Sequence, residues 1–184
     1  MNVVITAWLC LPGRMSAARP PLTMKTLFLV RHAKSSRDDP GVPDHDRPLN
    51  ARGQRQAPEM GRRLAGRNVK PDVILSSPAL RALTTAQLVA GEIGYATEDI
   101  AVDERLYASS AESLLSVVRA LDDKLSSAMV FGHNPEMSEL ASGLSDGNLE
   151  MPTCAVAEFR YDTKSWGDVG AIAPAKMTLD TPKT

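Results

Sequence analysis

Residues 27–34 read Leu27-Phe28-Leu29-Val30-Arg31-His32-Ala33-Lys34, an apolar run that ends in an arginine and a histidine. Such a run is too short for a membrane span and is typical of a strand buried on both faces of a parallel sheet. In parallel sheets, ligands bind beyond the carboxyl ends of the strands. Arg31 and His32 are therefore candidates for an anion-binding site, although the pair taken alone fits a surface loop equally well.

The composition is that of one domain with little net charge. A chain of 184 residues can bury a sizeable core, and 43% hydrophobic and 23% charged residues are ordinary values for a globular protein. The formal net charge of -1 gives no general attraction for nucleic acid or an anionic membrane, so we expect neither as a partner. Any affinity for anions has to be local.

Cysteines and histidines are too few and too scattered for a metal site. The cysteines are Cys10 and Cys154, and the histidines are His32, His45 and His133. None of the spacings of a zinc site or a disulfide framework occurs among them. We expect no metal, no cofactor and a reducing compartment, which favours a cytoplasmic location.

The two ends of the chain differ from its middle. Residues 3–11 are apolar, but no basic region precedes them and the stretch is too short to cross a membrane. We predict that residues 1–23 are a disordered or misassigned leader, with Met24 as an alternative start. The domain is then expected over 24–175, followed by a flexible tail over 176–184.

Strands and helices alternate along the domain. Polar residues with several prolines make 35–49 a loop, after which Asn50 can cap a helix over 51–66. Pro58 predicts a kink in this helix or a later start. Ser77-Pro78 and Asn134-Pro135 each supply a cap and a proline for a further helix. The remaining predicted elements are strands over 72–76, 100–102 and 128–132, a helix over 112–121, and an edge hairpin of 155–161 with 166–172.

This alternation predicts an α/β domain with a mostly parallel central sheet. The predicted strand 72–76 leads to Arg81 in the first turn of its helix, and the strand 128–132 leads to His133. If these strands lie parallel and adjacent to the first, then Arg31, His32, Arg81 and His133 converge at one edge, beside the positive ends of two helices. Two guanidinium groups and two imidazoles suit a dianionic phosphoryl group.

Four separated segments also resemble one protein family. They are Leu29-Val30-Arg31-His32-Ala33, Arg47-Pro48-Leu49-Asn50-Ala51-Arg52-Gly53, Ser76-Ser77-Pro78-Ala79-Leu80-Arg81-Ala82-Leu83-Thr84-Thr85-Ala86 and Gly132-His133-Asn134-Pro135. In this order they resemble the histidine phosphatase superfamily, and more closely its small SixA-type branch of phosphohistidine phosphatases. Ala33 stands where much of the superfamily has glycine. The resemblance implies a phosphoglycerate mutase-like fold, a three-layer α/β/α sandwich.

The resemblance further implies a role for each matched residue. His32 would attack phosphorus and carry the phosphoryl group until water removes it, while Arg31, Arg81 and His133 would bind the phosphoryl oxygens. Glu104 lies where many members have the acid that protonates the leaving group; a surface carboxylate paired with Arg105 is the alternative interpretation.

Other charged residues surround the predicted site. Asp46 is a weaker candidate for the acid. Arg47 is expected to organise the loop and help to bind substrate. Lys34, Arg37 and Arg52 fit either a basic rim or ordinary surface charge, and His45 fits a loop residue.

Three functions follow from these residues. The first is a phosphatase that dephosphorylates phosphohistidine in a protein, such as a histidine phosphotransfer domain, because little sequence between Arg81 and His133 is left for a lid. The second is a phosphatase, or less readily a mutase, for small phosphorylated metabolites. The third is a catalytically silent phosphate-binding module, against which the presence of His32 argues. No unused apolar helix face stands out, so we expect a monomer.

Overall fold

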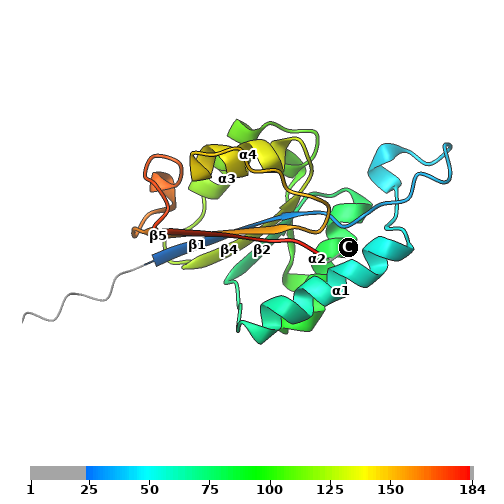
Figure 1. Ribbon diagram of the computed structural model, residues 1–184, viewed down its shortest axis with the longest axis horizontal. Coiled ribbons are helices and arrows are strands. Elements are labelled where there is room, and N and C mark those ends of the chain that lie inside the picture. Colours follow the sequence, from blue (N-terminus) through cyan, green and yellow to red (C-terminus); the bar gives the residue numbers. More distant parts are fainter. Residues whose placement is uncertain (1–23, 183–184) are drawn as a thin grey trace, which may run out of the picture.

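The computed structural model describes residues 24–182, which form a sheet with helices on both faces (Figure 1). Its strands are β1 Met24–Arg31, β2 Val73–Ser76, β3 Ala101–Val102, β4 Ser127–Gly132, β5 Val156–Asp162 and β6 Lys176–Asp180. Its α-helices are α1 Ala51–Gly66, α2 Leu80–Ile93, α3 Ala111–Arg119 and α4 Glu136–Ser145. Short 3-10 turns are η1 Asp44–Asp46, η2 Thr97–Asp99, η3 Glu104–Leu106 and η4 Trp166–Asp168.

The strand order is β3-β2-β4-β1-β5-β6. β3, β2, β4 and β1 run parallel, whereas β5 and β6 run antiparallel to their neighbours. β4 lies between β1 and β2, with Arg31 beside Gly132 and Ser76 beside Phe131. The predicted convergence of three strand ends at one edge is confirmed.

Successive side chains of the strands point to opposite faces of the sheet and pack in two hydrophobic cores, one on each face. In β1, Leu27 and Leu29 pack in the core under α3 and α4, while Phe28 and Val30 pack in the core over α1 and α2. Figure 1 shows the two helix pairs on opposite sides of the strands. Because β1 is buried on both faces, its sequence is a continuous apolar run. The predicted α/β/α sandwich is confirmed.

The helix starts differ from the sequence-based expectation. α1 begins at Ala51 and continues through Pro58, so the later start is wrong; buried side chains on both sides of the proline hold the helix against α2 and the sheet. α2 begins only at Leu80, with Ala79 as its N-cap residue; the Ser77 hydroxyl lies 2.8 Å from His133 Nε2 and accepts a long bond of 3.4 Å from the Ala79 N–H. Asn134 does not cap α4; its side-chain amide donates to Ser138 Oγ at 2.8 Å.

The C-terminal hairpin also differs. β5 pairs with β6, not with residues 166–172, where Trp166 starts the turn η4 and is completely buried. The predicted hairpin is therefore wrong, as is the end of the domain at residue 175, because the sheet continues to Asp180. β6 lies at the sheet edge, where each of its residues is exposed or only partly buried, and its apolar pattern is too weak to be recognised. The predicted leader lies outside the described residues.

Candidate active site

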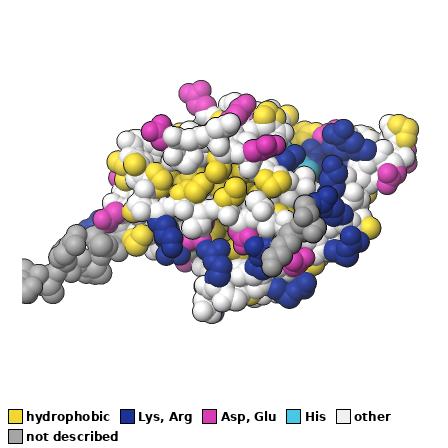
Figure 2. Space-filling view, in the orientation of Figure 1, with side chains coloured by type: hydrophobic (Ala, Val, Ile, Leu, Met, Phe, Trp, Pro, Cys, Tyr) yellow, Lys and Arg dark blue, Asp and Glu magenta, His cyan; other side chains and the backbone are white. Residues whose placement is uncertain are grey.

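A cavity of about 290 Å³ opens where β1, β2 and β4 end. Figure 2 shows a histidine side chain framed by lysine and arginine side chains at this end of the molecule. Residues from five separate parts of the chain line the cavity: Arg31, His32, Lys34, Ser35, Arg37, Asp44, Arg47, Arg81, His133, Asn134 and Thr153. The lining is strongly cationic, as a phosphoryl group requires.

His32 is held in one tautomer at the buried end of the cavity. Its Nδ1 lies 2.7 Å from the carbonyl oxygen of Ala33, and because a carbonyl only accepts, Nδ1 carries the proton. The lone pair is then on Nε2. Thr85 of α2 accepts a hydrogen bond from the Ala33 backbone N–H at 3.0 Å and so fixes this turn. Burial is the main reason that the pKa of His32 is lowered to about 4; the bond to Ala33 acts in the opposite direction, and the nearby arginines lower the pKa as well.

His133 faces His32, with 5.1 Å between the ring centroids. Its Nε2 is 2.8 Å from the Ser77 hydroxyl, while Nδ1 is buried and has no partner among the described residues. Burial lowers the pKa of His133 to about 3, and the neighbouring His32 and Arg81 act in the same direction. Both imidazoles are therefore neutral near pH 7.

Three of the four arginines that line the cavity have terminal nitrogens that are already held by the protein. Arg31 Nη1 donates to the Met151 carbonyl at 2.8 Å, and Arg81 Nη1 donates to the Asp44 carbonyl at 2.5 Å. Arg47 Nη2 lies 2.6 Å from Asp44 Oδ1. In each of these three arginines the Nε–H is buried and has no partner in the described part of the chain. These anchored guanidinium groups retain donors for an anion, and burial lowers the pKa of Arg31 without removing its charge.

Asp44 is a site residue that sequence reasoning missed. Its carboxylate accepts from Arg81 Nη2 at 2.9 Å and from the Tyr107 hydroxyl at 3.2 Å. Burial alone would raise the pKa of Asp44, but the guanidinium groups of Arg81 and Arg47 outweigh burial and hold the pKa below its ordinary value. The one signal in the sequence is its place three residues before Arg47, between two loop prolines.

Comparison with known proteins decides the family. The profile of the histidine phosphatase superfamily (branch 1) matches residues 27–110. A solved structure of SixA from Agrobacterium tumefaciens, a candidate phosphohistidine phosphatase, is 31% identical with a TM-score of 0.69, and the alignment covers 73% of this chain and 90% of that one. The chain belongs to the histidine phosphatase superfamily.

Two further relatives of this histidine phosphatase align over most of its length. The structure of a candidate SixA from Nakamurella multipartitia has a TM-score of 0.72 and 25% identity, covering 88% of this chain and 98% of that one. An uncharacterised protein of Mycobacterium tuberculosis is 34% identical over 167 residues, covering 84% of this chain and all of that protein. The resemblance to SixA-type proteins extends through both halves of the sheet.

Not every predicted site residue reaches the cavity of this histidine phosphatase. Arg31, His32, Arg47, Arg81 and His133 do. Among the other candidates, Lys34 and Arg37 line it, whereas Glu104, Asp46 and Arg52 are exposed outside it. Glu104 is exposed, as the alternative interpretation has it, but Arg105 pairs with Asp103 and not with Glu104. Asp46 binds His45.

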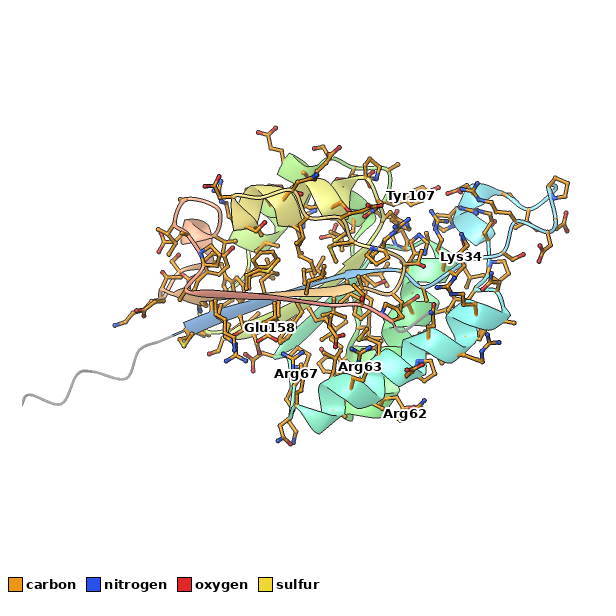
Figure 3. The ribbon with its side chains drawn as sticks, in the orientation of Figure 1. Lys34, Arg62, Arg63, Arg67, Tyr107 and Glu158 are labelled. Atoms are coloured by element: carbon orange, nitrogen blue, oxygen red, sulfur yellow. The ribbon has the colours of Figure 1, made fainter. Side chains whose placement is uncertain are left out.

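Ser77, Thr85 and Tyr107 are supporting residues that sequence analysis did not assign. Tyr107, labelled in Figure 3, lies edge-on to the His133 ring, with 5.6 Å between the ring centroids, and donates to Asp44. Among residues 24–182, no group of three or more His, Cys, Asp or Glu is placed to hold a metal ion. Within the same residues, no helix is both long and apolar enough to span a membrane.

Proposed function

We propose that this histidine phosphatase hydrolyses phosphohistidine in a protein, through a phosphoryl group carried transiently on His32. The observation that supports this best is the hydrogen bond from His32 Nδ1 to Ala33. It leaves the Nε2 lone pair as nucleophile in a cavity whose arginines have unpartnered Nε–H donors. A neutral imidazole is required for attack, and the lowered pKa of His32 provides it at neutral pH.

The reaction has two transfers. In the first, His32 Nε2 bonds to phosphorus while the bond from phosphorus to the leaving group breaks, and Arg31, Arg81 and Arg47 balance the charge on the phosphoryl oxygens. As Nε2 loses its lone pair, the ring becomes cationic and its Nδ1–H bond to Ala33 strengthens. In the second, water attacks phosphorus, the bond to Nε2 breaks and its electron pair returns to the ring, while the protons of the water stay on the released phosphate.

Two features support a protein substrate. Within the described residues, nothing from positions 82–132 lines the cavity, because this stretch builds α2, β3, η3 and α3. An uncovered site leaves room for a folded domain, whereas small substrates are usually enclosed. A phosphorylated imidazole also leaves without a strong enzymic acid, which agrees with the position of Glu104 outside the cavity.

The test compares a protein domain phosphorylated on histidine with a panel of phosphorylated metabolites, both in the presence of EDTA. We expect the wild-type enzyme to prefer the phosphoprotein, and His32→Ala to lower turnover about a thousandfold or more, because no other group supplies the nucleophile. His45→Ala is the matched control; it removes a histidine near the site that does not line the cavity. A clear preference for a metabolite would contradict the proposed substrate and leave the chemistry of His32 intact.

The intermediate gives a separate test. Rapid quenching at alkaline pH, followed by mass spectrometry, is expected to find the phosphoryl group on His32. A phosphorylated residue elsewhere in the chain would contradict the assigned nucleophile, and absence of turnover on every substrate would favour a phosphate-binding module.

A further inference from the structure

We propose that the Asp44 carboxylate makes the site selective for phosphorylated nitrogen over phosphorylated oxygen, by favouring a leaving group that is positively charged when it binds. The inference rests on the proposed function, from which it takes the nucleophile and the phosphoryl pocket. Among residues 24–182, Asp44 is the one carboxylate that lines the cavity. A negative charge in a pocket for a dianion needs a reason, because it opposes the binding of phosphate.

Asp44 lines the same cavity as His32 but is much more exposed to solvent. His32 is 8% exposed and lies at the inner end of the cavity, whereas the Asp44 side chain is 57% exposed at its rim. The attacking and leaving atoms lie roughly in line in phosphoryl transfer. The leaving group therefore departs away from His32 and toward solvent, into the outer part of the cavity, to which the exposed Asp44 side chain contributes.

Asp44 can keep this position when phosphate binds. Arg81 and Arg47 bind Asp44 through their terminal nitrogens and still have an unpartnered Nε–H each. Both guanidinium groups line the cavity and carry more N–H donors than these bonds use, so each can hold the carboxylate and a phosphoryl oxygen at the same time. The same two arginines favour the ionised carboxylate, so Asp44 acts by its charge and not as a proton donor.

The two classes of substrate differ in the charge of the leaving atom. A reactive phosphoimidazole carries a proton on its second ring nitrogen, so the ring is cationic. When His32 Nε2 bonds to phosphorus, the P–N bond breaks, its electron pair returns to the ring, and neutral imidazole leaves with that proton. In a phosphate ester the electron pair of the P–O bond stays on oxygen, which becomes negative. Asp44 attracts the cationic ring and repels the developing oxyanion.

The experiment measures kcat/KM for phosphoimidazole and for p-nitrophenyl phosphate, with wild type, Asp44→Asn and Asp44→Glu. The asparagine keeps an oxygen acceptor for the arginines and removes the charge. We expect the phosphoimidazole-to-ester ratio to fall about tenfold in Asp44→Asn. It should stay within about threefold of wild type in Asp44→Glu, which retains the charge. Asp39→Asn, an exposed carboxylate of the same loop outside this cavity, is the matched control and should leave the ratio unchanged.

A change in ratio separates selectivity from structural damage, because a loosened loop lowers both rates by the same factor. Equal losses on both substrates, or a larger loss on the ester, would overturn the inference and leave the proposed function standing. A wild-type enzyme that hydrolyses the ester but not phosphoimidazole or a phosphohistidine protein would overturn both. Thermal midpoints of the variants close to that of wild type show that folding does not contribute.

Discussion

His32 must be neutral to attack phosphorus, and the burial that keeps it neutral also makes folding dependent on pH. Its pKa of about 4 in the folded chain lies below the ordinary 6.5, so the unfolded chain takes up the proton first as pH falls. The free energy of unfolding therefore keeps its full value above pH 6.5, and the part that depends on His32 is lost as pH falls toward 4. For one such group the free energy of unfolding drops by about 2 kcal/mol between about pH 7 and about pH 5.

His32→Asn should remove this part of the pH dependence. Urea unfolding of both proteins near pH 7 and near pH 5 measures it: the loss on acidification should be smaller in the variant by about 2 kcal/mol. An equal loss in the two proteins would mean that His32 titrates normally in the folded chain.

Replacing Ser77 tests whether its hydrogen bond orients the His133 imidazole. Its hydroxyl contacts His133 Nε2 at 2.8 Å, and both side chains are buried. Ser77→Ala should lower kcat/KM about tenfold, because the imidazole loses the bond that sets its orientation and tautomer. Ser138→Ala is the comparison variant. Ser138 lies on α4 and accepts a hydrogen bond from Asn134, and its replacement is expected to lower kcat/KM less than Ser77→Ala does. Steady-state kinetics on one phosphoramidate substrate decides the order, and a larger loss in Ser138→Ala would contradict it.

At the scale of an element, the first turn of α1 supports the loop that follows His32. A Cβ on Gly53 would overlap the backbone carbonyl of Lys34, and Asn50 donates its backbone N–H to the same carbonyl at 2.9 Å. Gly53→Ala should therefore destabilise the fold by about 1–3 kcal/mol and lower activity, since Lys34 and Ser35 line the cavity. At Gly66, the last residue of the same helix, a Cβ meets open space, so Gly66→Ala should stabilise by about 0.5–1 kcal/mol. Denaturant unfolding of both variants checks this contrast in sign.

An element could be predicted from the sequence where its own run of apolar residues determines it, and not where contacts with distant residues determine it. β1 and β4 are apolar runs buried on both faces, so their ends, and with them His32 and His133, are visible as strand termini. Asp44 is not, because its place over Arg81 depends on the path of a loop that has no periodicity. The contact of Ser77 with His133 is not visible either, because it joins residues far apart in the chain. β6 was missed because an edge strand buries only part of its side chains.

At the scale of the whole molecule, a buried carboxylate joins the helical layer to the antiparallel edge of the sheet. Glu158 of β5 has a side chain only 4% exposed and pairs with Arg67, which follows α1, and with Arg160 on its own strand at 2.6 Å. Figure 3 shows Glu158 and Arg67 facing one another below the strands, with Arg63 nearby on α1. Arg63 in turn pairs with Asp180 of β6. Together these pairs connect α1 to both antiparallel strands.

Glu158 is buried whereas its partners Arg67 and Arg160 are partly exposed, so replacing the carboxylate and replacing the arginines should change the free energy of unfolding by different amounts. Replacing Arg67 and Arg160 together by methionine leaves a buried, unpaired carboxylate and should lower the free energy of unfolding by about 3 kcal/mol or more. Glu158→Leu leaves two arginines that are already 39% and 43% exposed and can be hydrated, so the loss should stay below about 1 kcal/mol. Urea unfolding at one pH measures both. Equal losses would show that Glu158 becomes hydrated when its partners are gone, and that the fold opens at this edge instead of retaining a buried charge.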